Sequence, residues 1–270
     1  MEAALPMYQF FSWNVDGYTQ EIHHWLQDYL ETNGPDVVFL SETKRSEPVL
    51  RHYFDQLKKY RYLINAHIPA QHHGVAMLIK DSHQYLPIPI QMNISVRKDT
   101  KSTEAATGRL LSIQLNEEVN VIGSYTPNSG SDLRNLGYRT KIWDPAFFQI
   151  LEILRANKPT LWMGDINVAL SELDVSNPVG MSSWAGFTRP ERTNFASLLA
   201  TGHWVDPWRL THPDTREYTW VGRVRRLGYG MRIDNIIVSE TLLPRVEETY
   251  ILSDAPTDTD HLPLVAHVRR

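Results

Sequence analysis

The feature of this sequence that most limits how the chain can fold is a series of short apolar runs along nearly its whole length. The runs lie at residues 8–15, 36–42, 60–67, 74–80, 109–115, 119–127, 160–167, 203–208, 217–221, 231–239 and 261–268. Several of them alternate apolar with polar residues, as antiparallel strands with one face on a core do. The sequence therefore predicts a protein built mainly from β-sheets.

Three amphipathic helices are predicted between these runs. In residues 19–30 the apolar side chains follow the three-then-four spacing of one helix face. A second helix is expected to begin at Asp144, which would cap it, with a proline in its first turn. A third helix should begin at Thr188, in a capping box with Glu191, and end near Gly202.

Many strands with a few helices indicate an α+β architecture in which two packed mixed sheets carry helices on their outer faces. No repeat, low-complexity tract or linker divides the sequence. We therefore expect a single domain over residues 1–270, with a core from about residue 8 onward.

The composition excludes several classes of protein. Cysteine is absent, so disulfides, thiolate metal sites and cysteine nucleophiles are ruled out. The N-terminal residues lack the basic lead and apolar stretch of a signal peptide. No apolar run approaches the ~20 residues that a transmembrane helix needs. The expectation is a soluble intracellular protein that acts as a monomer without membrane contact.

The formal net charge of −4 at first argues against a nucleic-acid partner, because proteins that bind phosphate backbones are usually basic. However, a metal-dependent nuclease concentrates carboxylates at its centre, and these offset a basic rim in the total charge. Residues 221–232 contain Arg223, Arg225, Arg226 and Arg232 together with three glycines. A solvated turn is the commoner fate of such a run, and a phosphate-binding loop is the alternative.

Polar side chains interrupt the apolar pattern at the ends of several predicted strands. They are Asn14, Asp16, Glu42, Tyr125, Asn128, Asp165, Asn167, Asp234, Asp260 and His261. Each alone has an ordinary explanation as a helix cap, a turn residue or a satisfied core histidine. Together they are costly to desolvate, and the ends of successive strands can converge on one edge of a sandwich. We therefore expect a functional site at that edge.

The residue types at this edge fit metal and phosphate chemistry. Asp16, Glu42 and Asp260 offer the hard oxygen ligands that Mg²⁺ prefers. His261 beside a carboxylate such as Asp234 would be held in one tautomer and kept cationic, which suits it to stabilise charge on a phosphate. The sequence thus predicts a metal-assisted site with a positively charged histidine.

Asp165 and Asn167 lie in the run LWMGDINVAL, with apolar residues on both sides. In an extended strand, side chains two residues apart point to the same face. The two groups are therefore expected to lie side by side at the end of a strand. An ionised Asp165 could deprotonate a water molecule, and Asn167 could hold that water or the carboxylate in place.

Ordered segments spread along the chain carry a resemblance to a known family. They are SWNVDG (12–17), LSETK (40–44), YTPNSG (125–130), GDINVA (164–169), AGFTRPER (185–192), RIDNIIVS (232–239) and TDHLPL (259–264). In this order they resemble the exonuclease III/AP endonuclease branch of the endonuclease–exonuclease–phosphatase superfamily. The resemblance implies a DNase I-like fold, a four-layered αββα sandwich, in agreement with the strand and helix pattern.

The resemblance also implies roles for the polar residues. Asp16, Glu42 and Asp260 would surround Mg²⁺, for which Mn²⁺ can substitute, with Asn14 in support. The remaining residues would activate water or stabilise the pentacovalent phosphate. The water-activating group is Asp165 with Asn167, Tyr125 and Asn128, and the phosphate-stabilising pair is His261 with Asp234.

Three positions match a pocket that accepts a sugar lacking its base, and they are Trp220, Met231 and Ile233. Met231 stands where the family usually has tryptophan, and Ser131 stands where some members have an arginine that inserts into the duplex. Arg225 and Arg226 would contact phosphates of the DNA backbone.

The resulting expectation is a Mg²⁺-dependent DNA-(apurinic or apyrimidinic site) endonuclease of DNA repair. It would cleave duplex DNA 5′ to abasic sites and leave a 3′-hydroxyl, with 3′–5′ exonuclease or 3′-phosphodiesterase activity as a companion. Three alternatives stay open. They are a retrotransposon-type or general DNA-nicking endonuclease, a small-molecule or lipid phosphodiesterase, and a catalytically inactive DNA-binding module. The AGFTRPER segment weighs against the first, and the complete set of catalytic residues weighs against the last.

Overall fold

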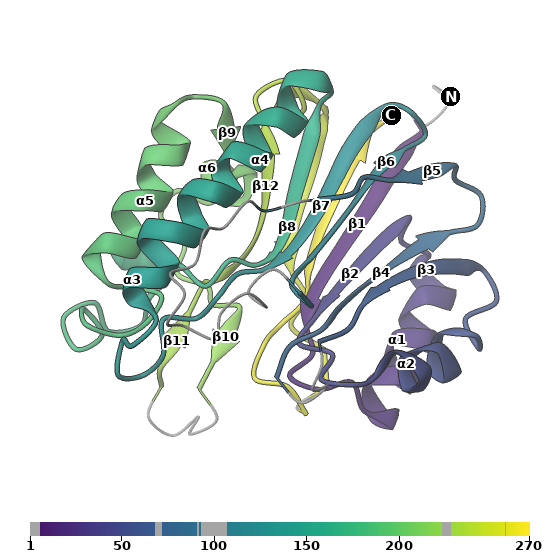
Figure 1. Cartoon of the computed structure of the whole chain (residues 1–270), viewed down its shortest axis with the longest axis horizontal. Coiled ribbons are helices and arrows are strands. Elements are labelled where there is room, and N and C mark those ends of the chain that lie inside the picture. Colours follow the sequence, from purple (N-terminus) through teal and green to yellow (C-terminus); the bar gives the residue numbers. More distant parts are fainter. Residues whose placement is uncertain (1–5, 68–71, 91, 93–106, 223–227, 257) are drawn as a thin grey trace.

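A computed structural model describes residues 6–67, 72–90, 92, 107–222, 228–256 and 258–270. In these residues two six-stranded sheets pack face to face, and helices cover the outer face of each sheet (Figure 1). Both sheets contain parallel and antiparallel pairs. The predicted four-layered αββα sandwich is therefore confirmed.

The first sheet contains the N-terminal and C-terminal strands. Its members are β1 (Met7–Asn14), β2 (Val37–Ser41), β3 (Tyr60–Asn65), β4 (Val75–Lys80), β13 (Val246–Ile251) and β14 (Leu264–Arg269). They lie in the order β13-β14-β1-β2-β4-β3. β1 and β2 are parallel, and the other neighbours pair antiparallel.

The second sheet is built from the middle of the chain. Its members are β5 (Tyr85–Pro87), β6 (Leu110–Leu115), β7 (Val119–Tyr125), β8 (Thr160–Asp165), β9 (Trp204–Val205) and β12 (Asp234–Ser239). They lie in the order β5-β6-β7-β8-β12-β9, and β7 and β8 are its parallel pair. A separate two-stranded ribbon joins β10 (Trp220–Val221) to β11 (Gly230–Met231).

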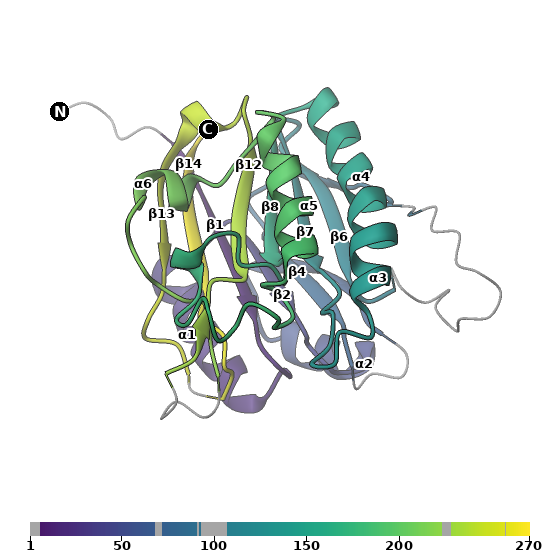
Figure 2. The ribbon, with the colours of Figure 1, turned by 90° about the vertical axis from the view of Figure 1, so that its left-hand side faces the viewer.

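Helices α1 (Gln20–Asn33) and α2 (Glu47–Phe54) cover the first sheet, and α4 (Asp144–Asn157) and α5 (Arg189–Ala200) cover the second. Figure 2 shows α4 and α5 side by side in front of the second sheet. The shorter elements are α3 (Leu136–Tyr138), the π-helical turn Arg139–Trp143, α6 (Pro207–Thr211) and the 3₁₀ turns Glu172–Asp174 and Leu243–Arg245. Within the described ranges, none of the helices has the length and apolar character to cross a bilayer.

Apolar side chains from both sheets fill the space between them. Phe10 and Phe39 from the first sheet and Val121 and Met163 from the second belong to this cluster, and all four are fully buried. Separate apolar clusters lie beneath the helices on each outer face. Full burial of one such side chain typically stabilises a fold by about 1.5–3 kcal/mol, so the sheets hold each other at a fixed separation.

Two of the predicted helices are confirmed, together with the capping box predicted for one of them. Thr19 caps α1 by accepting a hydrogen bond from the Ile22 N–H over 3.2 Å. Thr188 and Glu191 form the expected capping box at the start of α5. The helix then ends at Ala200, two residues before the predicted Gly202.

Two local expectations are wrong. Asp144 does not cap α4, because a π-helical turn precedes it and its carboxylate instead accepts a hydrogen bond from Arg139 Nε over 2.6 Å. The strand expected over 203–208 ends at Val205, because the side chain of Asp206 caps α6 by accepting from the Arg209 N–H.

The strands bring their polar ends to one edge, at the lower end of the molecule in Figure 1. Asp165 at the end of β8 lies beside Tyr125 of β7 and directly opposite Asp234 of β12. Gly164 precedes it with a φ of 137°, and a Cβ there would lie 2.1 Å from the carbonyl oxygen of Ser124. Only glycine fits this position, so it allows the close approach of β7 and β8 next to Asp165.

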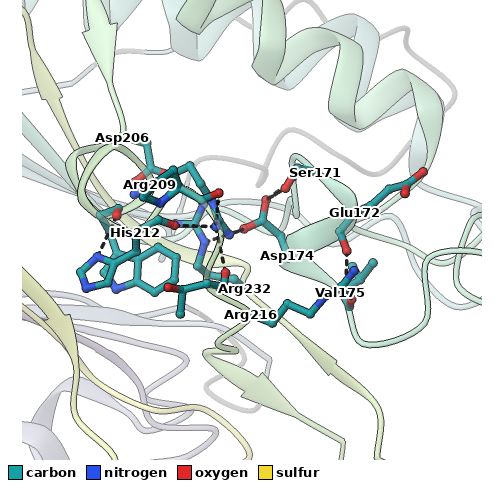
Figure 3. Close-up of polar contacts among 12 residues, drawn as sticks. Ser171, Glu172, Asp174, Val175, Asp206, Arg209, His212, Arg216 and Arg232 are labelled. Carbon is teal, nitrogen blue, oxygen red and sulfur yellow. Dashed lines mark hydrogen bonds and ion pairs between the residues drawn. The ribbon is translucent and has the colours of Figure 1, made fainter.

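A buried ion network surrounds Arg232, the residue directly after β11 (Figure 3). Arg232 is 2% exposed, and it donates from Nε to Asp174 over 2.7 Å and from a terminal nitrogen to Asp206 over 2.6 Å. Arg209 donates to the same oxygen of Asp174 over 2.6 Å. The network links Arg232, which lies between Met231 and Ile233, to the segment after β8 through Asp174 and to the start of α6 through Asp206.

Replacing Arg232 with methionine should destabilise the fold strongly, because Asp174 and Asp206 would stay buried without this partner. Removing one partner of a buried ion pair typically costs about 3–5 kcal/mol. Urea unfolding followed by tryptophan fluorescence measures the loss. Arg51→Met is the matched control, because Arg51 pairs with Glu47 at the surface, and its unfolding midpoint should stay close to that of the wild type. Equal midpoints for the two variants would contradict the structural role of the network.

Candidate active site

A cavity of about 530 Å³ opens at the edge where the polar strand ends meet. Most of the residues singled out in the sequence line it. They are Asp16, Glu42, Tyr125, Asn128, Asp165, Asn167, Trp220, Met231, Ile233, Asp260 and His261. Asn14 and Asp234 lie just behind this lining and bond to it. Arg225 and Arg226 lie outside the described residues.

Asp165 is the buried centre of the site. Asn14 donates from its side-chain amide to one carboxylate oxygen of Asp165 over 2.9 Å, and the backbone N–H of Asn167 donates to the other over 2.9 Å. Burial, followed by the nearby charge of Asp234, raises the pKa of Asp165 to about 8. The ionised form of Asp165 is therefore a stronger base than an ordinary aspartate, and it becomes the major form as the pH rises through about 8.

The expectation that Asp165 and Asn167 share one face of an extended strand is wrong. β8 ends at Asp165, and Asn167 has a left-handed φ of 49°. Its side-chain amide donates to the carbonyl of Thr126 over 2.8 Å, and its oxygen accepts from Asn128 over 2.8 Å. Asn167 therefore positions Asp165 through its backbone N–H, while its own side chain joins β8 to the segment after β7.

Arg139 holds this turn in place, a role that no sequence pattern indicated. Its side chain is buried and donates to the carbonyl of Ile166 over 2.8 Å and to that of Pro127 over 2.9 Å. These bonds satisfy backbone oxygens that the turn leaves without strand partners. Arg139 comes from the π-helical turn before α4, so its contact with the site was not visible from neighbouring residues in the chain.

His261 forms a close pair with Asp234. The distance from His261 Nδ1 to the Asp234 carboxylate is 2.7 Å. Burial alone would lower the pKa of the imidazole, but the carboxylate of Asp234 outweighs it and raises the pKa of His261 to about 10. The ring is therefore an imidazolium at neutral pH. Because Asp234 occupies Nδ1, Nε2 is the nitrogen available to a substrate.

Glu42 and Asp16 face a common cation, the ammonium of Lys44. Its Nζ lies 2.6 Å from Glu42 and also bonds Asp16. Burial would raise the pKa of Glu42, but Lys44 outweighs burial and the net pKa is lowered. Asp16, Glu42 and Lys44 all have left-handed φ values, between 44° and 51°, a strained conformation that clusters at functional sites. Lys44 lies inside the LSETK segment, but its contact with Asp16 follows only from the fold.

The residues at this edge fit a divalent cation. Asp165, Asp234 and His261 bring ligand atoms within 4.8 Å of one another, and Asp234 Oδ1 is buried without a hydrogen-bond partner in the described structure. However, His261 is protonated and already paired, which makes it a poor metal ligand. The carboxylates of Asp16 and Glu42 suit a hard cation better, since Lys44 shows that a positive charge fits between them.

Tyr125 contributes a neutral phenol to the site. Burial raises its pKa well above the ordinary value, so the hydroxyl keeps its proton. The guanidinium of Arg109 lies 4.9 Å from the centre of the ring, and His73 packs 5.7 Å from it. Burial and Arg109 lower the pKa of His73 to about 3. His73 is thus a neutral packing residue behind Tyr125.

An apolar wall closes one side of the cavity. Trp220 lies opposite Met231 in the β10–β11 ribbon, and Ile233 follows on the same strand path. The indole N–H of Trp220 donates to Asp260 over 3.0 Å, so this wall also orients a carboxylate. Trp184 completes the wall, although the sequence reading did not single it out. Its position directly before the AGFTRPER segment was the available signal.

Replacing Asp234 with asparagine should lower the pKa of His261 sharply. The substitution removes the carboxylate that raises this pKa, so the effect of burial, which lowers it, would dominate. In the wild type the imidazolium should persist until the pH nears 10. Its contribution to stability is complete below the ordinary pKa of about 6.5 and is lost as the pH rises through about 10. Nitrogen-15 NMR of the metal-free protein measures the ring directly. A His261 ring that titrates near 6.5 in both proteins would contradict the pairing.

Comparisons with known proteins agree with this geometry. Residues 11–261 match the model of the Endonuclease/Exonuclease/phosphatase family. A DNA-(apurinic or apyrimidinic site) endonuclease of Dictyostelium discoideum is 33% identical over 259 residues, which cover 94% of this chain and 68% of the relative. An exodeoxyribonuclease of Bacillus subtilis is 30% identical over 258 residues, 94% of this chain and 96% of the relative. The fold of an AP endonuclease of Leishmania major matches with a TM-score of 0.82 at 22% identity, over 98% of this chain and 88% of that one. The chain belongs to the endonuclease/exonuclease/phosphatase family, in its exonuclease III/AP endonuclease branch.

Proposed function

We propose that this chain is a divalent-metal-dependent DNA repair nuclease that cleaves duplex DNA 5′ to abasic sites and leaves a 3′-hydroxyl. The observation that carries the proposal is the buried Asp165, with its raised pKa, beside a His261–Asp234 pair in a cavity with an apolar wall. The names of its relatives, an AP endonuclease and an exodeoxyribonuclease, describe the same class of reaction.

In this proposal Asp165 accepts a proton from the attacking water. The new bond forms between the water oxygen and phosphorus, while the bond from phosphorus to the 3′ oxygen breaks and that oxygen takes up a proton from solvent water to become the 3′-hydroxyl. His261 donates from Nε2 to a phosphate oxygen and stabilises the negative charge that builds up there. Tyr125, whose phenol stays neutral, and Asn128, which donates to Asn167, support this water-activating group. Asn167 keeps Asp165 in place through its backbone N–H.

Asp16, Glu42 and Asp260 are the residues proposed to hold the cation, with Mg²⁺ as the ion and Mn²⁺ as a substitute. Asn14 supports them, since its side-chain amide donates to Glu42 and to Asp165 over 2.9 Å each. When bound, a divalent ion stabilises charge on the phosphate. The carboxylates fit such an ion because Mg²⁺ is bound by a few carboxylates together with water and substrate oxygens.

Selectivity for abasic DNA is proposed to come from the apolar wall. A sugar without a base leaves the duplex at lower cost, because no base must be unstacked. Trp220, Met231 and Ile233 would then hold the sugar, and Arg225 and Arg226 would contact phosphates. The proposal treats residues 1–270 as one catalytic domain that acts as a monomer, and 3′–5′ exonuclease or 3′-phosphodiesterase activity would use the same site.

Asp165→Asn should lose most of its cleavage rate, since a positioned base typically contributes about 10²–10⁴-fold. The substitution keeps the size of the side chain, so folding should be unaffected. Single-turnover assays with Mg²⁺ or EDTA, on matched duplexes with and without an abasic-site analogue, measure the effect. Near-normal cleavage by the variant would refute the role of Asp165. Equal cleavage of both duplexes by the wild type would favour a general DNA-nicking endonuclease instead.

Trp220→Ala should reduce the preference for abasic over intact duplex, because the pocket loses its wall. Trp220 also orients Asp260 through its indole N–H, so Trp220→Phe serves as the control that keeps a ring but loses the bond. The phenylalanine variant should keep the preference and require more Mg²⁺. The measurement is kcat/KM on both duplexes over a Mg²⁺ titration. If the alanine variant keeps the wild-type preference, the sugar is held elsewhere.

A further inference from the structure

Trp184 lies in the wall of the catalytic cavity, yet the chemistry proposed above gives it no task. It lines the same cavity as Asp165, His261 and Met231. Trp184 is 37% exposed, whereas Trp13 is 1% exposed. An exposed indole at the mouth of a polar site is unusual, because aromatic surface is normally buried in the core or in an interface.

The backbone holds Trp184 firmly in position. Its N–H donates to the carbonyl of Met181 over 2.9 Å, and its own carbonyl accepts from the N–H of Phe187 over 3.0 Å. Two residues further, the carbonyl of Gly186 accepts from Ala169 in the segment that follows Asp165. The indole therefore stands on a turn that is tied directly to the catalytic segment.

A second aromatic ring packs against the indole. The ring of Tyr229, just before β11, lies 4.9 Å from that of Trp184, with an angle of 49° between the planes. Tyr229 itself packs against the apolar cluster that contains Met231. This contact orients the indole while leaving part of its surface exposed to the cavity.

The chemistry of this mouth fits a nucleobase. A cavity of about 530 Å³ lies within the range of pockets that enclose drug-sized ligands, so it has room beyond a bare sugar. Met231 adds flexibility, because a thioether adapts its shape more readily than a rigid ring. Stacking on an aromatic ring needs no particular base, since every base presents a π-face.

We propose that Trp184, supported by Tyr229, is a stacking platform for one unpaired base of the DNA strand that the enzyme cuts. This inference rests on the proposed nuclease function and extends its substrate class. The platform would retain a target nucleotide that still carries its base but has lost its pairing partner, such as a mismatched 3′-terminal nucleotide. Trp184 is then a specificity residue that acts on base-bearing DNA, whereas Trp220 in the same wall holds the baseless sugar.

The test compares two DNA ligands by binding, in EDTA, so that cleavage plays no part. One is a duplex with a mismatched 3′-terminal 2-aminopurine, whose fluorescence is quenched by stacking, and the other is a duplex with an abasic-site analogue. Base–aromatic stacking typically contributes enough to change affinity about 5- to 150-fold. Trp184→Ala should weaken the first ligand by this factor relative to the second and should reduce the quenching. Trp184→Phe should restore most of both effects.

Val179→Ala is the matched control. Val179 belongs to the same loop and is 87% exposed, but it does not line the cavity, so its affinity ratio and quenching should match the wild type. An unchanged ratio in Trp184→Ala would overturn the platform, as would an equal loss for both ligands. Failure of the proposed function itself would appear separately, as a wild-type protein that does not cleave the abasic duplex with Mg²⁺.

Discussion

The site depends on two carboxylates held directly opposite each other on antiparallel strands. Asp165 on β8 faces Asp234 on β12, an arrangement of like charges that destabilises a sheet unless something compensates. The compensation comes from the other sheet: His261, near the start of β14, pairs with Asp234, and Asn14 of β1 donates to Asp165. The edge that carries the candidate site therefore also joins the two sheets, and the apolar core that fixes their separation fixes the geometry of the site.

The same edge concentrates backbone strain. Asp16, Glu42 and Asn167 each adopt a left-handed conformation just after a strand ends, at a typical cost of about 1–3 kcal/mol each. Hydrogen bonds to fixed groups hold these turns, as when Arg139 bonds the carbonyl of Ile166. The layered core supplies the stability that offsets this strain. The left-handed turns direct side chains into the cavity, whereas an extended residue would continue along the strand.

The sequence predicted the layers and most of the site because both depend on local patterns. Alternating strands reveal the sheets, and the capping box of Thr188 and Glu191 reveals α5. Strand β13 was not predicted, because its sequence VEETYI has two exposed glutamates at the edge of a sheet. The turn at Asn167 could not be foreseen, since a left-handed residue after a strand leaves no periodic signal.

Contacts between distant segments were equally invisible in the sequence. The bond from Lys44 to Asp16 and the packing of Trp184 on Tyr229 both require the folded chain. Arg225 and Arg226 stay predictions, because they lie outside the described residues.

The ammonium of Lys44 lies between Glu42 and Asp16, so it would compete with any metal ion for these two carboxylates. An ion that reaches these two carboxylates meets a site where a cation of the chain itself already offsets one of the two negative charges. Metal binding would then be an exchange of one cation for another. Because the ammonium belongs to the same chain, its local concentration at the carboxylates does not fall when the protein is diluted. A divalent ion held by these carboxylates would have to displace the ammonium first, which raises the ion concentration needed for occupancy by a factor that does not depend on the concentration of the protein.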